Sequence, residues 1–380
     1  MSFLIFIIYI VLLILNMYYS VKGTTNKSIL TITYLLIGIL FVGNSGMYGD
    51  AVKYKLDYEQ NAFGDGWGEI GYEILKKICR LIGIDKYNVF LLVIFILSSI
   101  LFYIGFKNLY LKWHVIFAIS MIFIVPTAAT VIRYTLALSI VVFSLQYLFK
   151  NETIKYIALV FISSLFHKSM IIFALFALVR KNYKNINANQ LKNIKTTLLV
   201  FMFSFAIIAS VFNKIPLLDI ALYTMQHLFN IDINKINAYF NGNFTRLGGF
   251  IFYPIYIIGL ILNNQIYNDI TKIKNQSMQT IIYMSNTINY LSSCFIPLIA
   301  INLVFYRYLI LVSFINAFIY SIYKRNVYYN ESKIRITNHL SISNIDILFI
   351  LYCLSWLFPE IMHIHSISIF GLVKDLFIFI

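Results

Sequence analysis

The sequence predicts an all-α, polytopic membrane protein, and its composition carries the prediction. Of its 380 residues, 60% are hydrophobic and 12% are charged, and the mean hydropathy is +0.80. Soluble chains carry about a quarter charged residues. The apolar residues also gather in runs near the roughly 20 residues that a helix needs to cross a bilayer. These properties exclude a disordered chain, a disulfide-rich scaffold and an ordinary cytosolic enzyme.

The apolar runs predict a single integral membrane domain over residues 1–380, with about 11–14 helices if short, broken or re-entrant ones are included. Spans are expected near 2–19, 28–44, 88–106, 114–131, 132–149, 195–212, 249–262, 279–300, 304–323 and 345–358. Further apolar stretches cover 154–179 and 361–380. The first run lacks a basic leader and a small-residue cleavage site, so it is expected to be a retained span.

Basic residues in the short loops orient this bundle, because cytoplasmic loops are enriched in lysine and arginine. Lys22 and Lys27 follow the first span, which places the N-terminus outside. The acid-rich loop 45–87 and the loop 213–248 are then external. The net charge of +15 is spread among such loops rather than massed in one stripe. We therefore expect contact with the lipid bilayer and none with nucleic acid.

The apolar stretch 154–179 does not fit this alternation as one span. It would place five basic residues outside with no acid among them: Arg180, Lys181, Lys184, Lys192 and Lys195. The polar triplet His167-Lys168-Ser169 interrupts the stretch. We predict a hairpin of two short helices, each about 19 Å long, that turns at the triplet. Its apex would lie in a cavity open to the outside.

Arginine is scarce, with seven residues against twenty-three lysines, so arginines at the outer face are informative. Arg133 and Arg307 each open a span there, and Arg246 lies in the second outer loop. A guanidinium binds two phosphate oxygens at once, which predicts an anionic ligand such as a pyrophosphate. Snorkelling, or pairing with the loop acids, is the alternative for each, and it is favoured for Arg80.

Other outer residues could supply acid–base chemistry. His167 carries an imidazole and Asp50, which ends the second span, carries a carboxylate, so either could act as a general base. Tyr54 follows Asp50 by one helical turn and could stack on a sugar ring. No metal is expected at His363 and His365, which lie two residues apart.

Five motifs, in order, resemble a known family. They are Asp50-Ala-Val-Lys-Tyr54, Gly71-Tyr72-Glu73, Arg133-Tyr-Thr-Leu-Ala137, His167-Lys168-Ser169 and Tyr306-Arg307-Tyr308. Over about 30–325 the chain resembles the EpsG-type, Wzy-like family of bacterial polysaccharide polymerases, which make O-antigen, capsule or exopolysaccharide. Tyr134 stands where that pattern commonly has Gln or a small residue, and Met170 where Ala is frequent.

The resemblance implies a multi-pass glycosyltransferase of the bacterial inner membrane, with its active site facing the periplasm or cell exterior; a GT-C-like architecture is compatible with it. The substrate would be an oligosaccharide repeat unit on undecaprenyl diphosphate, and a chain-length regulator would be a further partner. No cofactor is expected. The catalytic residues would be His167, Asp50 and Arg133. Those binding substrate or diphosphate would be Arg133, Arg246, Arg307, Lys168, Tyr54 and Tyr308.

Three other functions remain open at this point. Broken helices and buried charges are also typical of transporters, such as a flippase or exporter for lipid-linked oligosaccharides. A cell-wall sugar acyltransferase would need its histidine to face the cytoplasm. A transferase that uses polyprenyl-phosphate sugars would place paired acids in the first outer loop, as Asp50 and Asp57 could provide.

Overall fold

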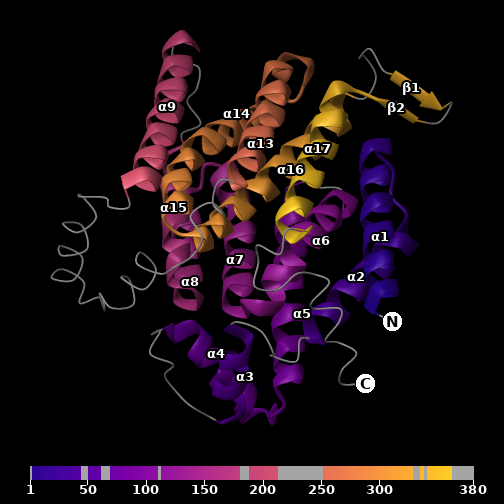
Figure 1. Cartoon of the computed structure of the whole chain (residues 1–380), viewed down its shortest axis with the longest axis vertical. Helices are drawn as coiled ribbons and strands as arrows, with labels where there is room; N and C mark the ends of the chain where they lie inside the picture. The colour runs from indigo at the N-terminus through magenta and orange to yellow at the C-terminus, as the bar shows by residue number, and fades with distance from the viewer. Residues whose placement is uncertain are drawn as a thin grey trace.

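The computed structural model describes residues 2–43, 50–60, 69–109, 113–179, 188–212, 251–327, 334–337 and 340–361. Helices form its architecture, which confirms the predicted all-α class (Figure 1). Three features named above lie outside the described residues. They are the segment 213–248 with Arg246, for which an external loop was predicted, the basic segment 180–187, and residues 362–380 with His363 and His365.

The helices follow the predicted apolar runs closely. The first part of the chain forms α1 (Ser2–Lys22), α2 (Lys27–Val42), α3 (Asp50–Glu59), α4 (Ile70–Leu81), α5 (Tyr87–Asn108), α6 (Trp113–Thr130), α7 (Ile132–Phe149), α8 (Thr153–Phe166), the 3-10 helix η1 (Lys168–Leu178) and α9 (Ala188–Phe212). The second part forms α13 (Phe252–Asn268), η3 (Ile270–Lys272), α14 (Gln276–Leu291), η4 (Ser292–Cys294), α15 (Phe295–Ile301), η5 (Leu303–Tyr306), α16 (Arg307–Val327) and α17 (Asn344–Ile361).

Within the described residues, four helices are long and apolar enough to cross a membrane: Leu4–Lys22, Tyr87–Lys107, Ile132–Phe149 and Val304–Asn326. The last two are 89% buried, whereas the first two are 39% and 33% buried. Helices α7 and α16 thus form the centre of the bundle, and α1 and α5 present apolar side chains outward. An apolar surface of this kind is typical of an integral membrane protein.

Two parts of the chain differ from the predicted spans. The span expected over 279–300 is divided into α14, the short η4 and α15. A small antiparallel hairpin, β1 (Ile334–Thr337) and β2 (Leu340–Ile342), was not predicted. Four residues of alternating Ile and polar type are too short a pattern to distinguish a strand from a loop.

The apolar stretch 154–179 is broken at His167, where the backbone is extended (φ −153°, ψ 108°). Helix α8 and η1 then run back along each other. The Tyr156 hydroxyl of α8 donates a hydrogen bond to the backbone carbonyl of Phe173 in η1 at 2.7 Å. The second arm is a 3-10 helix rather than the expected α-helix. The side of the membrane that the turn faces stays a prediction.

Helices α3 and α4 lie together at one end of the bundle, beside α5, α7 and α8, and the β1–β2 hairpin lies at the opposite end (Figure 1). Tyr58 of α3 stacks on Phe90 of α5 with ring centroids 4.3 Å apart. Helix α4 approaches α8 closely, since a Cβ at Gly71 would lie 3.1 Å from the carbonyl oxygen of Leu165. This packing brings the start of α4 to the turn at His167.

Candidate functional site

Glu69, the residue before α4, contacts three of the groups that the motifs single out. Its Oε2 lies 3.0 Å from Nη1 of Arg133. Its Oε1 lies 3.2 Å from Nδ1 of His167 and accepts a hydrogen bond from the backbone N–H of Lys168 at 3.3 Å. The carboxylate side chain is only 5% exposed. Glu69 is therefore a buried anion that joins the first turn of α7 to the turn of the α8–η1 hairpin.

The local backbone explains why the Glu69 side chain is available for these contacts. Its carbonyl accepts hydrogen bonds from the N–H groups of Tyr72 and Glu73, and so begins α4. Its carboxylate makes no capping hydrogen bond to that helix. A carboxylate at a helix N-terminus is also favoured by the helix dipole. The side chain thus keeps a favourable position while it reaches the neighbouring helices.

Arg133 is held from two sides. Val131 breaks the chain between α6 and α7 (φ −128°, ψ 64°), so Arg133 lies in the first turn of α7. Its guanidinium lies 4.6 Å from the ring centroid of Tyr54 and 5.6 Å from that of Tyr72. Burial raises the pKa of Tyr72 well above its usual value, so this ring stays a neutral phenol. Two aromatic faces and one carboxylate offset the cost of burying the charge, which is 7% exposed.

Tyr134 connects His167 to Arg307. Its ring meets the His167 imidazole edge-on, with centroids 5.6 Å apart. Its hydroxyl donates a hydrogen bond to the backbone carbonyl of Arg307, the first residue of α16. Three motifs that are distant in sequence thus meet at one place, at the ends of α7, α8 and α16.

The predicted site residues differ in accessibility. The side chain of Lys168 is exposed, and those of His167 and Arg307 are partly exposed. Tyr308 is 6% exposed, and its ring packs against Phe295 and Phe173 with centroids 5.2 Å and 5.8 Å away. Tyr308 therefore belongs to the aromatic packing behind the site. Its predicted contact with substrate or diphosphate would need this ring to be uncovered.

The remaining candidates are acidic or lie in undescribed segments. Asp50 is the first residue of α3, and its side chain, like the whole of Arg246, is outside the described part. Asp57 forms an ion pair with Lys76, which also lies 2.9 Å from Glu73. Within the described ranges, no three His, Cys, Asp or Glu side chains lie together as a candidate metal site.

Glu69 is the residue that the sequence interpretation missed. It is one of seven acids in loop 45–87, and nothing in its residue type distinguishes it from the other six. Its position two residues before Gly71-Tyr72-Glu73 was the available signal. Sequence spacing cannot show which of seven acids in a loop turns inward, because that depends on how the loop helices dock.

The arrangement can bind and polarise an anionic or hydroxyl-bearing substrate. Glu69 is within reach of a hydrogen bond from Nδ1–H of His167. Such a bond would leave Nε2 as the basic nitrogen of the ring. The neighbouring cationic groups of Lys168 and Arg307 are at least partly accessible. A basic imidazole beside accessible cations suits proton transfer next to a developing negative charge.

Comparison with known proteins gives one family. The model of the EpsG family matches residues 27–370, which is nearly the whole chain. No curated protein and no solved structure matches the chain.

Proposed function

Because this chain belongs to the EpsG family of Wzy-like membrane polysaccharide polymerases, we propose that it joins oligosaccharide repeat units carried on undecaprenyl diphosphate. The growing chain would leave its lipid diphosphate and be transferred to a hydroxyl of the next lipid-linked unit. The enzyme would act at the outer face of the bacterial cytoplasmic membrane. The observation that carries the proposal is the contact of Glu69 with both Arg133 and His167 at one end of the bundle.

In the proposed reaction, the acceptor hydroxyl oxygen bonds to the anomeric carbon of the donor sugar. The bond from that carbon to the diphosphate oxygen breaks, and its electron pair leaves with the diphosphate. The hydroxyl proton passes to Nε2 of His167, whose Nδ1 lies 3.2 Å from Oε1 of Glu69. A carboxylate beside Nδ1 also stabilises the imidazolium that forms.

The cations divide into two roles. Arg133 is buried and paired with Glu69, so its first effect is to hold that carboxylate in place. Lys168 is exposed and Arg307 is partly exposed, so both can approach the oxygens of a diphosphate. Positive groups fixed next to a leaving group stabilise its charge in the transition state. Arg246 could add to them from the outer loop 213–248, and Asp50 stays a candidate second base.

The experiment that tests this function uses the purified full-length protein in lipid nanodiscs. It is supplied with a synthetic lipid-linked repeat unit, without nucleotide sugars or ATP, and the products are resolved by length. The proposed function predicts a ladder of longer lipid-linked saccharides and release of undecaprenyl diphosphate. A protein that moves the substrate between leaflets but never lengthens it would be a flippase, and the proposal would be rejected.

A transferase that uses polyprenyl-phosphate sugars is the second candidate, and it depends on a pair of acids in the first outer loop. Asp57 is held in an ion pair by the buried Lys76, which opposes its use as a base. The same assay, with a polyprenyl-monophosphate sugar as the only donor, separates the two. Transfer from the monophosphate donor and not from the diphosphate donor would favour the second candidate.

A further inference from the structure

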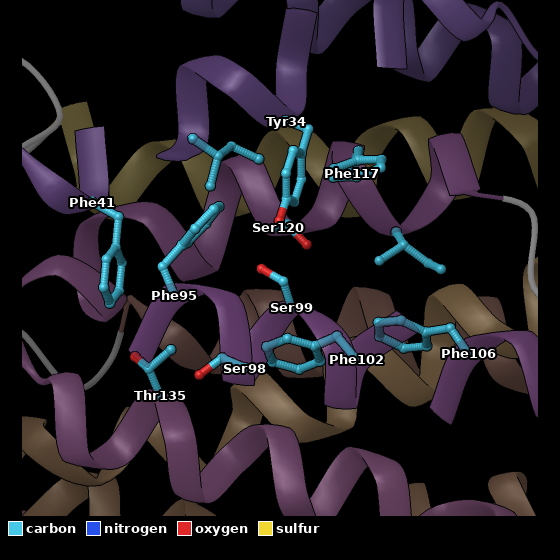
Figure 2. Close-up of a pocket in the computed structure, with 12 residues that line it drawn as sticks. Tyr34, Phe41, Phe95, Ser98, Ser99, Phe102, Phe106, Phe117, Ser120 and Thr135 are labelled. Carbon is cyan, nitrogen blue, oxygen red and sulfur yellow. The ribbon is translucent and has the colours of Figure 1, made fainter. Parts of the chain in front are cut away.

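Helices α2, α5, α6 and α7 line an apolar cavity of about 70 Å³, which we name the α5 crevice (Figure 2). Helix α5 lines it with Phe95, Ser98, Ser99, Phe102 and Phe106. These residues recur at intervals of three and four, so they share one face of the helix. At about 1.5 Å per residue, the lined face is roughly 16 Å long. The crevice is thus long and narrow, with its length along the helix axis.

Residues with short side chains leave room for the α5 crevice, and aromatic rings border it. Ser98 and Ser99 of α5, Ser120 of α6 and Thr135 of α7 line the crevice with short side chains. Ser98 is 3% exposed, and its hydroxyl has no hydrogen-bond partner among the described residues. A long apolar groove with a few small hydroxyls suits a flexible hydrocarbon chain better than a polar ligand.

One long side of the crevice is open. Phe95, Ser99 and Phe102 are partly exposed, whereas Ser98 and Phe106 are buried. The neighbouring side chains of Ile96 and Ile100 on α5 are 44% and 48% exposed. The opening therefore lies beside the apolar outer surface of α5, from which a membrane lipid could enter.

One end of the crevice adjoins the site around Glu69. Thr135 lies two residues after Arg133 in the first turns of α7. Phe41 belongs to the same buried cluster as Tyr54 and Tyr72, whose rings lie against the Arg133 guanidinium. Figure 2 shows Phe41 and Thr135 at one end of the crevice and Phe106 at the other. A ligand in the crevice would thus have one end beside the charged site and the rest along α5.

We propose that the α5 crevice binds the isoprenoid chain of the lipid diphosphate donor, with the units nearest the diphosphate beside Thr135. This inference rests on the proposed function, because it takes the donor to be a lipid diphosphate. The occupant needs an anionic group at the site end, to match Lys168 and Arg307, and a long apolar chain behind it. Moving that chain from the bilayer into a groove brings no hydrophobic gain. The crevice therefore aligns the donor by packing, and the charged site supplies most of the affinity.

Photolabelling tests the inference directly. Full-length protein in nanodiscs is irradiated with a polyprenyl diphosphate that carries a diazirine close to the diphosphate, and the labelled peptides are identified by mass spectrometry. We expect labels at the Thr135 end of the crevice, on Phe41 of α2, Phe95 of α5 and Thr135 of α7. Ser99→Trp, which fills the crevice, is expected to lower this labelling about tenfold, equivalent to about 1.4 kcal/mol. Ser120→Phe should do the same from α6.

The matched control is Ile100→Trp, the same substitution on the next residue of α5, whose side chain points outward. Its labelling should equal that of the unmodified protein. A phosphatidylglycerol with the same diazirine serves as the second probe. If it labels the crevice and polyprenyl diphosphate does not displace it, the crevice is an ordinary lipid site and the inference is overturned.

Failure of the inference and failure of the proposed function give different results. If the protein extends chains but the labels lie outside the α5 crevice and are unchanged in Ser99→Trp, the proposed lipid site is wrong and the polymerase function stands. Crevice labelling without any chain extension supports the crevice and rejects the polymerase. If neither filling variant yields monodisperse protein, the positions of the labels on the unmodified protein decide.

Discussion

The carboxylate of Glu69 lies 3.0 Å from a guanidinium nitrogen of Arg133, and both side chains are almost fully buried. A buried charge is costly unless it is paired, so each of these residues depends on the other. The pair joins a loop helix to a helix of the bundle centre. It therefore affects both the fold and the chemistry at this end of the protein.

Glu69→Gln should weaken both stability and activity. The amide cannot compensate the Arg133 charge, and breaking one partner of a buried pair costs about 3–5 kcal/mol. Thermal unfolding of the purified protein measures the first effect, and the length of the polymer formed measures the second. In the double variant Glu69→Gln with Arg133→Gln, stability should partly return while polymer formation does not.

The control for this pair is Glu73→Gln, in the first turn of the helix that Glu69 precedes. Glu73 is 19% exposed and contacts Lys76, which keeps its second partner Asp57. We expect nearly normal polymer in this variant. If Glu73→Gln lost as much polymer as Glu69→Gln, the contacts of Glu69 with Arg133 and His167 would not explain the loss.

His167→Gln should abolish rapid polymerisation without unfolding the protein. General base catalysis contributes about 10²–10⁴-fold to rate, and glutamine cannot accept the proton. The rate constant with saturating repeat unit should fall by that factor, while KM changes little. If the variant keeps normal chain extension, His167 is not the base, and Asp50→Asn becomes the variant to measure.

Tyr134→Phe removes the hydroxyl that bonds the Arg307 carbonyl and keeps the ring that meets His167. One lost hydrogen bond should cost about 1 kcal/mol of stability. Because α16 begins at Arg307, we also expect KM for the lipid-linked donor to rise several-fold. This rise corresponds to about 1 kcal/mol of lost binding free energy.

Tyr156→Phe is the matched control for Tyr134→Phe. It also removes a buried hydroxyl that donates to a backbone carbonyl, here that of Phe173. Its stability loss should be similar and its KM normal. Equal KM values in the two variants would contradict a positioning role for Tyr134.

Gly71→Val should separate α4 from α8. A Cβ at this position already lies 3.1 Å from the Leu165 carbonyl oxygen and 3.2 Å from its Cβ, and branched γ-carbons leave no room for relaxation. The resulting shift of α4 should move Glu69 away from His167 and lower polymer yield more than it lowers protein yield. Ile74→Val, at a residue of α4 that is 51% exposed, should change neither.

The charge-deficient, apolar sequence was enough to predict an all-helical membrane bundle, because hydropathy alone decides which segments can be buried in lipid. It also located the break at His167-Lys168-Ser169, since three polar residues inside an apolar run are expensive at membrane depth. The 3-10 geometry of η1 was not predictable. A uniformly apolar segment carries no periodicity that would distinguish one helix type from another.

The motifs and their order in the sequence named Arg133, His167, Arg307 and Tyr54 as candidates for one site. Their partners were decided by tertiary packing. Glu69 was one acid among seven until α4 docked on α8, and Tyr134 reaches a carbonyl 173 residues away. Hydropathy fixes which helices enter the membrane, but ion pairs and hydrogen bonds depend on distances of a few ångströms between helices. Those distances exist only once the helices have packed.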